Sequence, residues 1–159
     1  MQNGFTADSL RRVLVRGTSA NVASLAALAV CGRRETGSSS AGINAISHWA
    51  WGDERARRDD WTWKHTAVGA LTNQAAAMFW AYCYERLFAL RRGPATAPRL
   101  VAEAAAMSTI ACAVDYTITP RRLTPGYELR LSKPSLFAVY VAFAAGLAIG
   151  SAMLPQNER

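Results

Sequence analysis

The stretch SLFAVYVAFAAGLAIGSAML, residues 135–154, contains no charged side chain and decides the expected fold. At a rise of about 1.5 Å per residue, an α-helix of this length spans roughly 30 Å, the thickness of the hydrocarbon core of a bilayer. Pro134 suits the first position of such a helix, where a backbone N–H has no partner to lose. The sequence therefore predicts a transmembrane helix over residues 135–154.

A similar apolar segment precedes it at residues 100–119. Pro98 lies just before this segment and Pro120 directly after it, so its limits are well marked. It carries Glu103 near its start and Asp115 near its end. Polar groups that face lipid are costly, so we expect Asp115, together with Ser108, Cys112 and Thr119 on the same stripe, to face the interior of a helix bundle.

Two more spans are expected closer to the N-terminus, at residues 13–32 and 63–88. Asp59 or Asp60 is the expected N-cap of the second. The first contains Arg16, whose long side chain we expect to reach outward to the lipid head groups. A cleaved signal peptide would explain the same first segment, but further spans follow, which favours an uncleaved span.

The composition agrees with a membrane protein once the distribution of charge is considered. The chain has 159 residues, 51% of them hydrophobic, and a net charge of +7. Charged residues gather between the apolar segments, where cations meet anionic lipid head groups, so we expect no nucleic-acid partner. Cys31, Cys83 and Cys112 all lie in apolar stretches and form no CxxC pair, which argues against disulfides and a zinc site. Residues 1–159 are predicted to form one all-α integral-membrane domain with four spans.

Between the first and second spans, INAISHWAWGD, residues 43–53, is typical of a short amphipathic helix. Asn44, Ser47, His48 and Trp51 fall at positions i, i+3, i+4 and i+7, which would place them on one face. We expect this helix to lie in the membrane interface rather than across the bilayer.

Four of the five tryptophans are predicted interface anchors: Trp49, Trp51, Trp61 and Trp63. Indole rings prefer the boundary between water and lipid, which agrees with an interfacial segment. The alternative is a set of core tryptophans in a soluble helical domain.

Small residues recur every four positions in the fourth span, at Ala138, Ala142, Gly146 and Gly150. Such a stripe lets helices approach closely in lipid, so it is a predicted packing surface, within the chain or between two copies. An alanine-rich sequence would also produce this pattern by chance.

A polar cluster is expected at one end of the bundle. If consecutive spans alternate in direction, the start of the second and the end of the third lie together, which brings His65 close to Asp115. His48 and the loop with Arg121 and Arg122 belong to the same end. Three interpretations stay open: an arginine neutralises Asp115 in a structural cluster, the histidines and Asp115 bind a metal, or the cluster relays protons or binds a ligand.

At the opposite end, Glu85 and Glu103 lie among arginines that include Arg86 and Arg99. We expect interfacial ion pairs there, with small effects on stability.

Two segments, residues 43–53 with their SHWAWGD and residues 114–132 with VDYTITPRRLTPGYELRLS, resemble parts of small uncharacterised bacterial four-span inner-membrane proteins. The resemblance covers the chain from about residue 43 onwards. It implies a bacterial inner-membrane location and assigns no catalytic residue. Small four-span multidrug exporters are similar in span number only, since their membrane-embedded glutamate in the first span has no counterpart here.

The first functional hypothesis is a non-enzymatic accessory or interaction protein that acts through helix packing. The second is a small oligomeric transporter or channel that uses His65 and Asp115, because four spans are few to enclose a transport path alone. The third is a metal-dependent membrane enzyme. Neither a Walker A sequence nor a GxSxG motif is present, and we expect no cofactor. The expected partners are the lipid bilayer and a second copy or another membrane protein.

Overall fold

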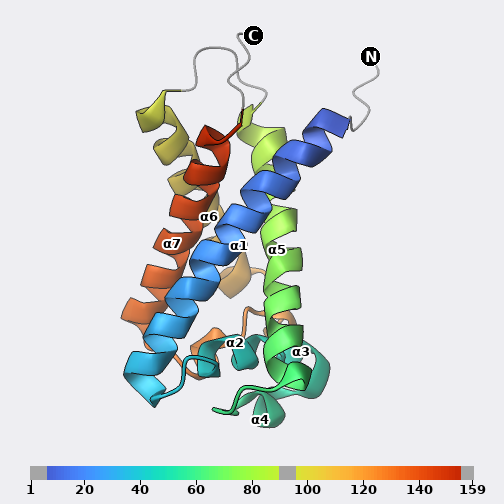
Figure 1. Ribbon diagram of the computed structural model, residues 1–159, viewed down its shortest axis with the longest axis vertical. Coiled ribbons are helices and arrows are strands. Elements are labelled where there is room, and N and C mark those ends of the chain that lie inside the picture. The colour runs from blue at the N-terminus through green and yellow to red at the C-terminus, as the bar shows by residue number, and fades with distance from the viewer. Residues whose placement is uncertain (1–6, 90–95, 155–159) are drawn as a thin grey trace.

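The computed structural model describes residues 7–89 and 96–154, and all regular secondary structure in these residues is helical. The body of the molecule consists of α1 (Ala7–Thr36), α5 (Val68–Tyr84), α6 (Ala97–Thr117) and α7 (Lys133–Ala152). Short π-helical segments, η1 (Trp63–Ala67) and η2 (Glu85–Ala89), extend α5 at both ends. Consecutive long helices run in opposite directions (Figure 1). The prediction of an all-α protein is confirmed.

Three of the described helices, α1, α6 and α7, are long and apolar enough to cross a membrane. They correspond to the first, third and fourth predicted spans. The helix at the second, α5, is 17 residues long without its π-helical extensions. α1 has 30 residues and extends beyond the predicted limits of 13 and 32.

The helical segment at the second predicted span is capped by Thr62, so the prediction of Asp59 or Asp60 as the cap was wrong. The Thr62 hydroxyl oxygen accepts a hydrogen bond from the backbone N–H of His65 at 3.1 Å. Asp60 instead accepts a hydrogen bond from Arg58 at 2.8 Å, and this bond lowers the pKa of the Asp60 carboxyl. The Asp60 carboxylate therefore pairs with Arg58 instead of capping the helix.

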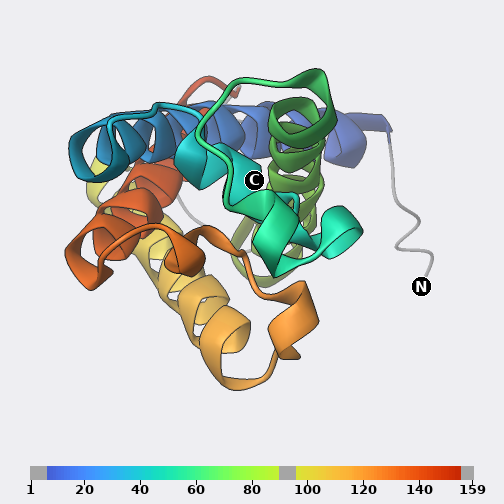
Figure 2. The same ribbon diagram turned by 90° about the horizontal axis from the view of Figure 1, so that it is seen from below.

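The bundle is closed on three sides and looser on the fourth. α1 packs against both α7 and α5, and α6 packs against α7. α5 and α6 make few contacts with each other. In Figure 1, α1 crosses in front of α7 and α5 while α6 lies behind, and the end-on view of Figure 2 shows α5 and α6 apart. This separation positions the site described below.

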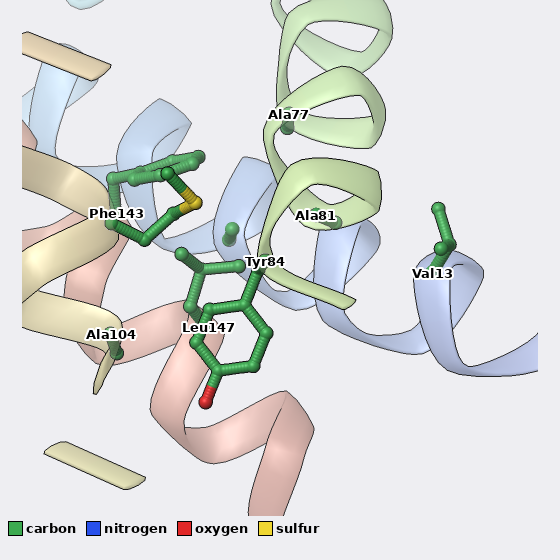
Figure 3. Close-up of a cluster of buried hydrophobic side chains, with 9 residues drawn as sticks. Val13, Ala77, Ala81, Tyr84, Ala104, Phe143 and Leu147 are labelled. Atoms are coloured by element: carbon green, nitrogen blue, oxygen red, sulfur yellow. The ribbon is translucent and has the colours of Figure 1, made fainter. Parts of the chain in front are cut away.

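A hydrophobic core joins all four long helices near one end of the bundle. Tyr84, Leu147 and Met107 are almost completely buried in it, and Phe143 packs beside them (Figure 3). Small side chains such as Ala81 let the helices approach around these large ones. Burial of a large apolar side chain contributes about 1.5–3 kcal/mol to the stability of a protein in water.

Large apolar side chains also cover the outside of the long helices. Examples from each helix are Val22, Leu71, Val101 and Phe137. Several polar and charged side chains are instead buried inside the bundle: Arg16, Asn21, Ser24, Glu85, Glu103, Ser108 and Ser151. An apolar exterior around a partly polar interior is the arrangement expected where lipid surrounds the helices.

Residues 43–53 do not form the single amphipathic helix that was predicted. This part of the chain is divided among α2 (Ala41–Ile46), α3 (His48–Trp51) and the start of α4 (Asp53–Ala56). Ser47 separates the first two helices, since its N–H and hydroxyl both donate to the carbonyl oxygen of Asn44. Gly52, with a φ of 82°, separates α3 from α4. The three short helices lie across one end of the bundle (Figure 2).

The polar face predicted for this helix is turned inward. Asn44, Ser47 and His48 are all buried. The Asn44 amide donates to the carbonyl oxygens of Arg58 and Asp60, at 3.0 and 2.9 Å. Asn44 thus satisfies the backbone of the following loop instead of facing water. The periodicity of the sequence cannot distinguish an inward polar face from an outward one.

Candidate functional site

A cavity of about 500 Å³ lies where α5 and α6 separate. Ala76 and Trp80 of α5 line it on one side, and Ala111 and Asp115 of α6 line it on another. Phe143 of α7 also contributes to its wall. The volume is within the range of about 300–1,000 Å³ typical of small-molecule sites.

Asp115 is the acidic group in the wall of this cavity. Its carboxylate accepts a hydrogen bond from the Tyr140 hydroxyl at 2.7 Å. No ion pair to Asp115 is found within residues 7–89 and 96–154. A carboxylate bonded to one neutral hydroxyl in a largely apolar wall is poorly compensated, so it would gain from a further hydrogen-bond donor or a cation.

Aromatic rings surround this carboxylate. The Tyr116 and Tyr127 rings each lie 6.3 Å from the Tyr140 ring, measured between centroids and with edge contacts. Burial raises the pKa of Tyr127, which keeps its hydroxyl neutral. Trp49 and Trp80 extend the aromatic wall of the cavity. Ring faces in such a wall suit both apolar groups and organic cations.

A polar contact closes the side of the cavity nearest α1. The Asn73 amide of α5 donates to the side-chain oxygen of Asn21 at 2.7 Å and to the Ser24 hydroxyl at 3.0 Å. Asn73 and Ser24 are both part of the cavity wall. This pair of bonds fixes α5 to α1 and leaves the looser side of the cavity toward α6.

The loop between α6 and α7 covers one end of the cavity through Leu123, Pro125 and Tyr127. It is attached to α3 at the carbonyl oxygen of Thr124, which accepts from His48 Nε2 at 2.9 Å and from Trp49 Nε1 at 2.7 Å. The loop and α3 therefore form one cap over this end of the site.

His48 holds the parts of this cap together. Its Nδ1 lies 3.0 Å from a carboxylate oxygen of Asp53, and its Nε2 faces the Thr124 carbonyl. Both ring nitrogens thus lie within hydrogen-bonding distance of an oxygen atom. The structure gives His48 a positioning role in the cap, and it is not part of the cavity wall.

The five residues of the predicted polar cluster are not joined to one another by any ion pair in the described part of the chain. His65 is buried, and its Nδ1 lies 3.1 Å from the Thr62 hydroxyl. Arg121 and Arg122 are exposed, so the expected neutralisation of Asp115 by an arginine is not found among the described ion pairs. The described residues also contain no group of three or more His, Cys, Asp or Glu side chains suited to a metal.

At the other end of the bundle, Arg16 and Glu85 form a buried ion pair that was not predicted. The Arg16 Nε also donates to the Ser151 hydroxyl at 2.8 Å, and the guanidinium lies 5.0 Å from the centre of the Tyr84 ring. Arg16 therefore points into the bundle, and the expectation that it reaches the head groups was wrong. The signal in the sequence was an arginine within one apolar segment and a glutamate at the matching end of the next.

Glu103 lies in the same region and keeps one of its expected partners. Arg99, one turn earlier in α6, donates to it at 2.9 Å, and the Tyr84 hydroxyl lies 3.3 Å from it. Glu103 is 9% exposed, so the bonds to it are more sheltered than those of an interfacial ion pair.

The stripe of small residues in α7 divides into two parts. A Cβ added to Gly146 would lie 2.5 Å from Ala20 Cα, and one added to Gly150 would lie 2.8 Å from Arg16 Cα. This half of the stripe packs against α1 within the same chain. Ala142 is half-buried and Ala138 is exposed.

The predicted anchor tryptophans lie at the capped end of the bundle and differ in exposure. Trp61 and Trp63 are 59% and 76% exposed, and Trp49 is 37% exposed. Trp51 is half-buried, with the Lys64 ammonium 4.6 Å from the centre of its ring.

The cavity can hold a molecule that is mostly apolar and carries one donor or cationic group for Asp115. Its wall combines alanine and aromatic side chains with a few polar groups, the usual composition of a binding site for a small molecule. Comparison of the chain with protein families, with curated proteins and with solved structures found no match.

Proposed function

We propose that the chain is a four-span integral membrane protein of the bacterial inner membrane that binds a small, largely apolar molecule between α5 and α6. The observation that carries this proposal is the cavity of about 500 Å³ between helices that otherwise make few contacts. A bundle built only for packing would bring α5 and α6 together, since contact between them would fill this space.

Membrane insertion of all four long helices is supported by their exteriors. α5 carries the exposed Leu71 on its outer side, as the three longer helices carry exposed apolar residues on theirs. With η1 and η2, the helical run at α5 extends from Trp63 to Ala89, which is long enough to cross a hydrocarbon core. The polar contacts of Asn73 face α1, so they are hidden from lipid.

Binding is the function best supported by the chemistry of the cavity. Asp115 and the rings near it form a polar end, and Ala76, Phe79 and Phe143 supply apolar wall. A ligand that enters from the bilayer would keep its apolar part away from water throughout, so the cost of its transfer would be small. Transport of the bound molecule would be one use of such a site. Asp115 would then take part in transport, whereas His65 is not in the cavity wall.

The proposal is tested with a photoreactive alcohol, 1-octanol bearing a diazirine, and the full chain in nanodiscs of phosphatidylcholine. We expect saturable labelling of cavity residues such as Trp80, and competition by excess octanol. Ala76→Phe should abolish this labelling because the larger side chain fills the cavity. Ala105→Phe is the matched control, since Ala105 is exposed on α6 and lies outside the cavity wall. Labelling that is unsaturable and equal in both variants would contradict the proposal.

The accessory role is the second candidate function, and it is favoured by the exposure of α6. Of the three candidate spans, α6 is the least buried within the molecule, because only 22% of its most apolar stretch is covered by the rest of the chain. In this role its outer face, with Ala102, Ala105 and Ala106, would pack against a second copy of the chain. Ala105→Phe separates the two functions, because it would disrupt such a dimer, seen by cross-linking in nanodiscs, and leave alcohol binding intact.

A further inference from the structure

The carboxylate in the cavity wall indicates what kind of molecule the cavity holds. We propose that the ligand is an amphiphilic organic cation whose ammonium group pairs with Asp115 while its apolar body lies between α5 and α6. This inference rests on the proposed function and makes it more specific.

The first argument is the lack of charge compensation at Asp115. The Tyr140 hydroxyl is its hydrogen-bond donor at 2.7 Å, and none of the cationic side chains that the structure describes pairs with it. The basic residues of the adjoining loop are directed elsewhere, since Arg121 is exposed and Arg130 pairs with Asp59. Asp115 is half-buried in a largely apolar wall, where a carboxylate without a cation is poorly compensated, so a cationic ligand would be stabilised there.

The second argument is the local sign of charge. Glu128 is the other carboxylate beside these rings, with its oxygens 2.6 Å from the Thr124 hydroxyl and 3.4 Å from the Tyr116 hydroxyl. Its charge adds to that of Asp115 and disfavours an anionic ligand. Tyr127 and Trp49 also line the cavity, and neutral aromatic rings attract a cation that lies over their faces.

The third argument is depth in the membrane. Asp115 is two residues before the end of α6 at Thr117. The exposed rings of Trp61 and Trp63 lie at this same capped end of the bundle. If these rings lie at the head-group level, Asp115 is close to it too. An amphiphile with an ammonium group takes this depth in a bilayer, with its tail toward the centre and alongside the apolar cavity wall.

The test compares two probes that differ in one group, diazirine-bearing octylamine and diazirine-bearing octanol. Both are applied at neutral pH to the full chain in nanodiscs of zwitterionic phosphatidylcholine, which limits electrostatic attraction of the amine to the lipid. We expect the amine to saturate the cavity at a concentration about tenfold lower than the alcohol, as a charge-assisted bond adds to apolar burial.

Asp115→Asn is the decisive variant, because asparagine keeps the shape and still accepts from Tyr140 while the charge is lost. It should remove the preference for the amine by weakening amine labelling about tenfold, with alcohol labelling unchanged. Glu128→Gln is the matched control, since Glu128 lies outside the cavity wall and its substitution should retain most of the preference.

The outcomes separate this inference from the proposed function. Equal saturation by both probes, or a preference that persists in Asp115→Asn, overturns the cationic ligand and leaves the apolar cavity intact. Loss of the preference in Glu128→Gln but not in Asp115→Asn overturns the assignment to Asp115. Failure of both probes to label the cavity overturns the proposed function and this inference together.

Discussion

The guanidinium of Arg16 in α1 pairs with the carboxylate of Glu85 in η2, and the two residues are only 5% and 4% exposed. The pair therefore lies inside the bundle, although Arg16 belongs to a helix that is long and apolar enough to cross a membrane. Ser151 of α7 accepts a further hydrogen bond from Arg16. One arginine thus connects three elements at the end of the molecule opposite the cap.

Loss of one member of this pair is expected to lower stability strongly. Glu85→Gln leaves the Arg16 charge buried without its counterion, which costs about 3–5 kcal/mol. The double variant Arg16→Met with Glu85→Leu should lose much less, since it buries apolar groups of similar volume instead. Thermal unfolding in detergent micelles, followed by circular dichroism, measures both. Equal losses in the single and double variants would mean that the pair is not buried as described.

The sequence shows both charged residues of this pair, but it does not show which way the Arg16 side chain points. An arginine near the end of a span can extend to the head groups or turn into the bundle, because its side chain is long enough for both. Only the position of Glu85 on a neighbouring helix, 69 residues later in the chain, decides between them. Periodicity within one helix could not supply that information.

The candidate site was predictable in part. Asp115 was expected to face the interior of the bundle, because a carboxylate in an apolar segment is costly in lipid, and it does line the cavity. The cavity itself depends on the separation of α5 from α6, which results from how both helices pack on α1 and α7. His48 was assigned to the same cluster, but Gly52 ends α3 and directs Asp53 back to its ring.

Gly146→Ala tests the close approach of α1 and α7 through the sign of its effect. In a helix without close neighbours this change stabilises by about 1 kcal/mol, because alanine is the better helix former. Here the added Cβ would lie 2.5 Å from Ala20 Cα, so the helices must move apart. We expect a net loss of about 1–3 kcal/mol, measured by thermal unfolding in detergent.

The neighbouring residue Ala145 provides the control. It is exposed on the outer side of α7, so Ala145→Gly should lower stability by about 1 kcal/mol through helix propensity alone. A gain in stability for Gly146→Ala would contradict the packing of α7 against α1.

Gly126→Ala is expected to loosen the cap over the cavity. Gly126 has a φ of 89°, where an L-residue is strained by about 1–2 kcal/mol, and an added Cβ would lie 2.5 Å from His48 Cδ2. Gly52→Ala is the matched control, because its φ of 82° imposes similar strain while no atom lies within 4 Å of the added Cβ. The Gly126 variant should therefore lose more stability than the Gly52 variant, and the emission of Trp49 should shift only in the former. Equal losses would indicate that contact with His48 is unimportant.

The tryptophans of the capped end are expected to lie at the surface of the bilayer. Trp63 is 76% exposed in the molecule, so its ring is free to meet lipid head groups rather than protein. In a variant that keeps Trp63 as its only tryptophan, phosphatidylcholine brominated near the head group should quench emission more strongly than lipid brominated near the chain end. A variant that keeps only Trp80, which lies within α5 and in the cavity wall, should show a smaller difference or the reverse order. Absence of quenching of Trp63 by either lipid would place this end of the bundle in water, and the depth argued for Asp115 would then be wrong.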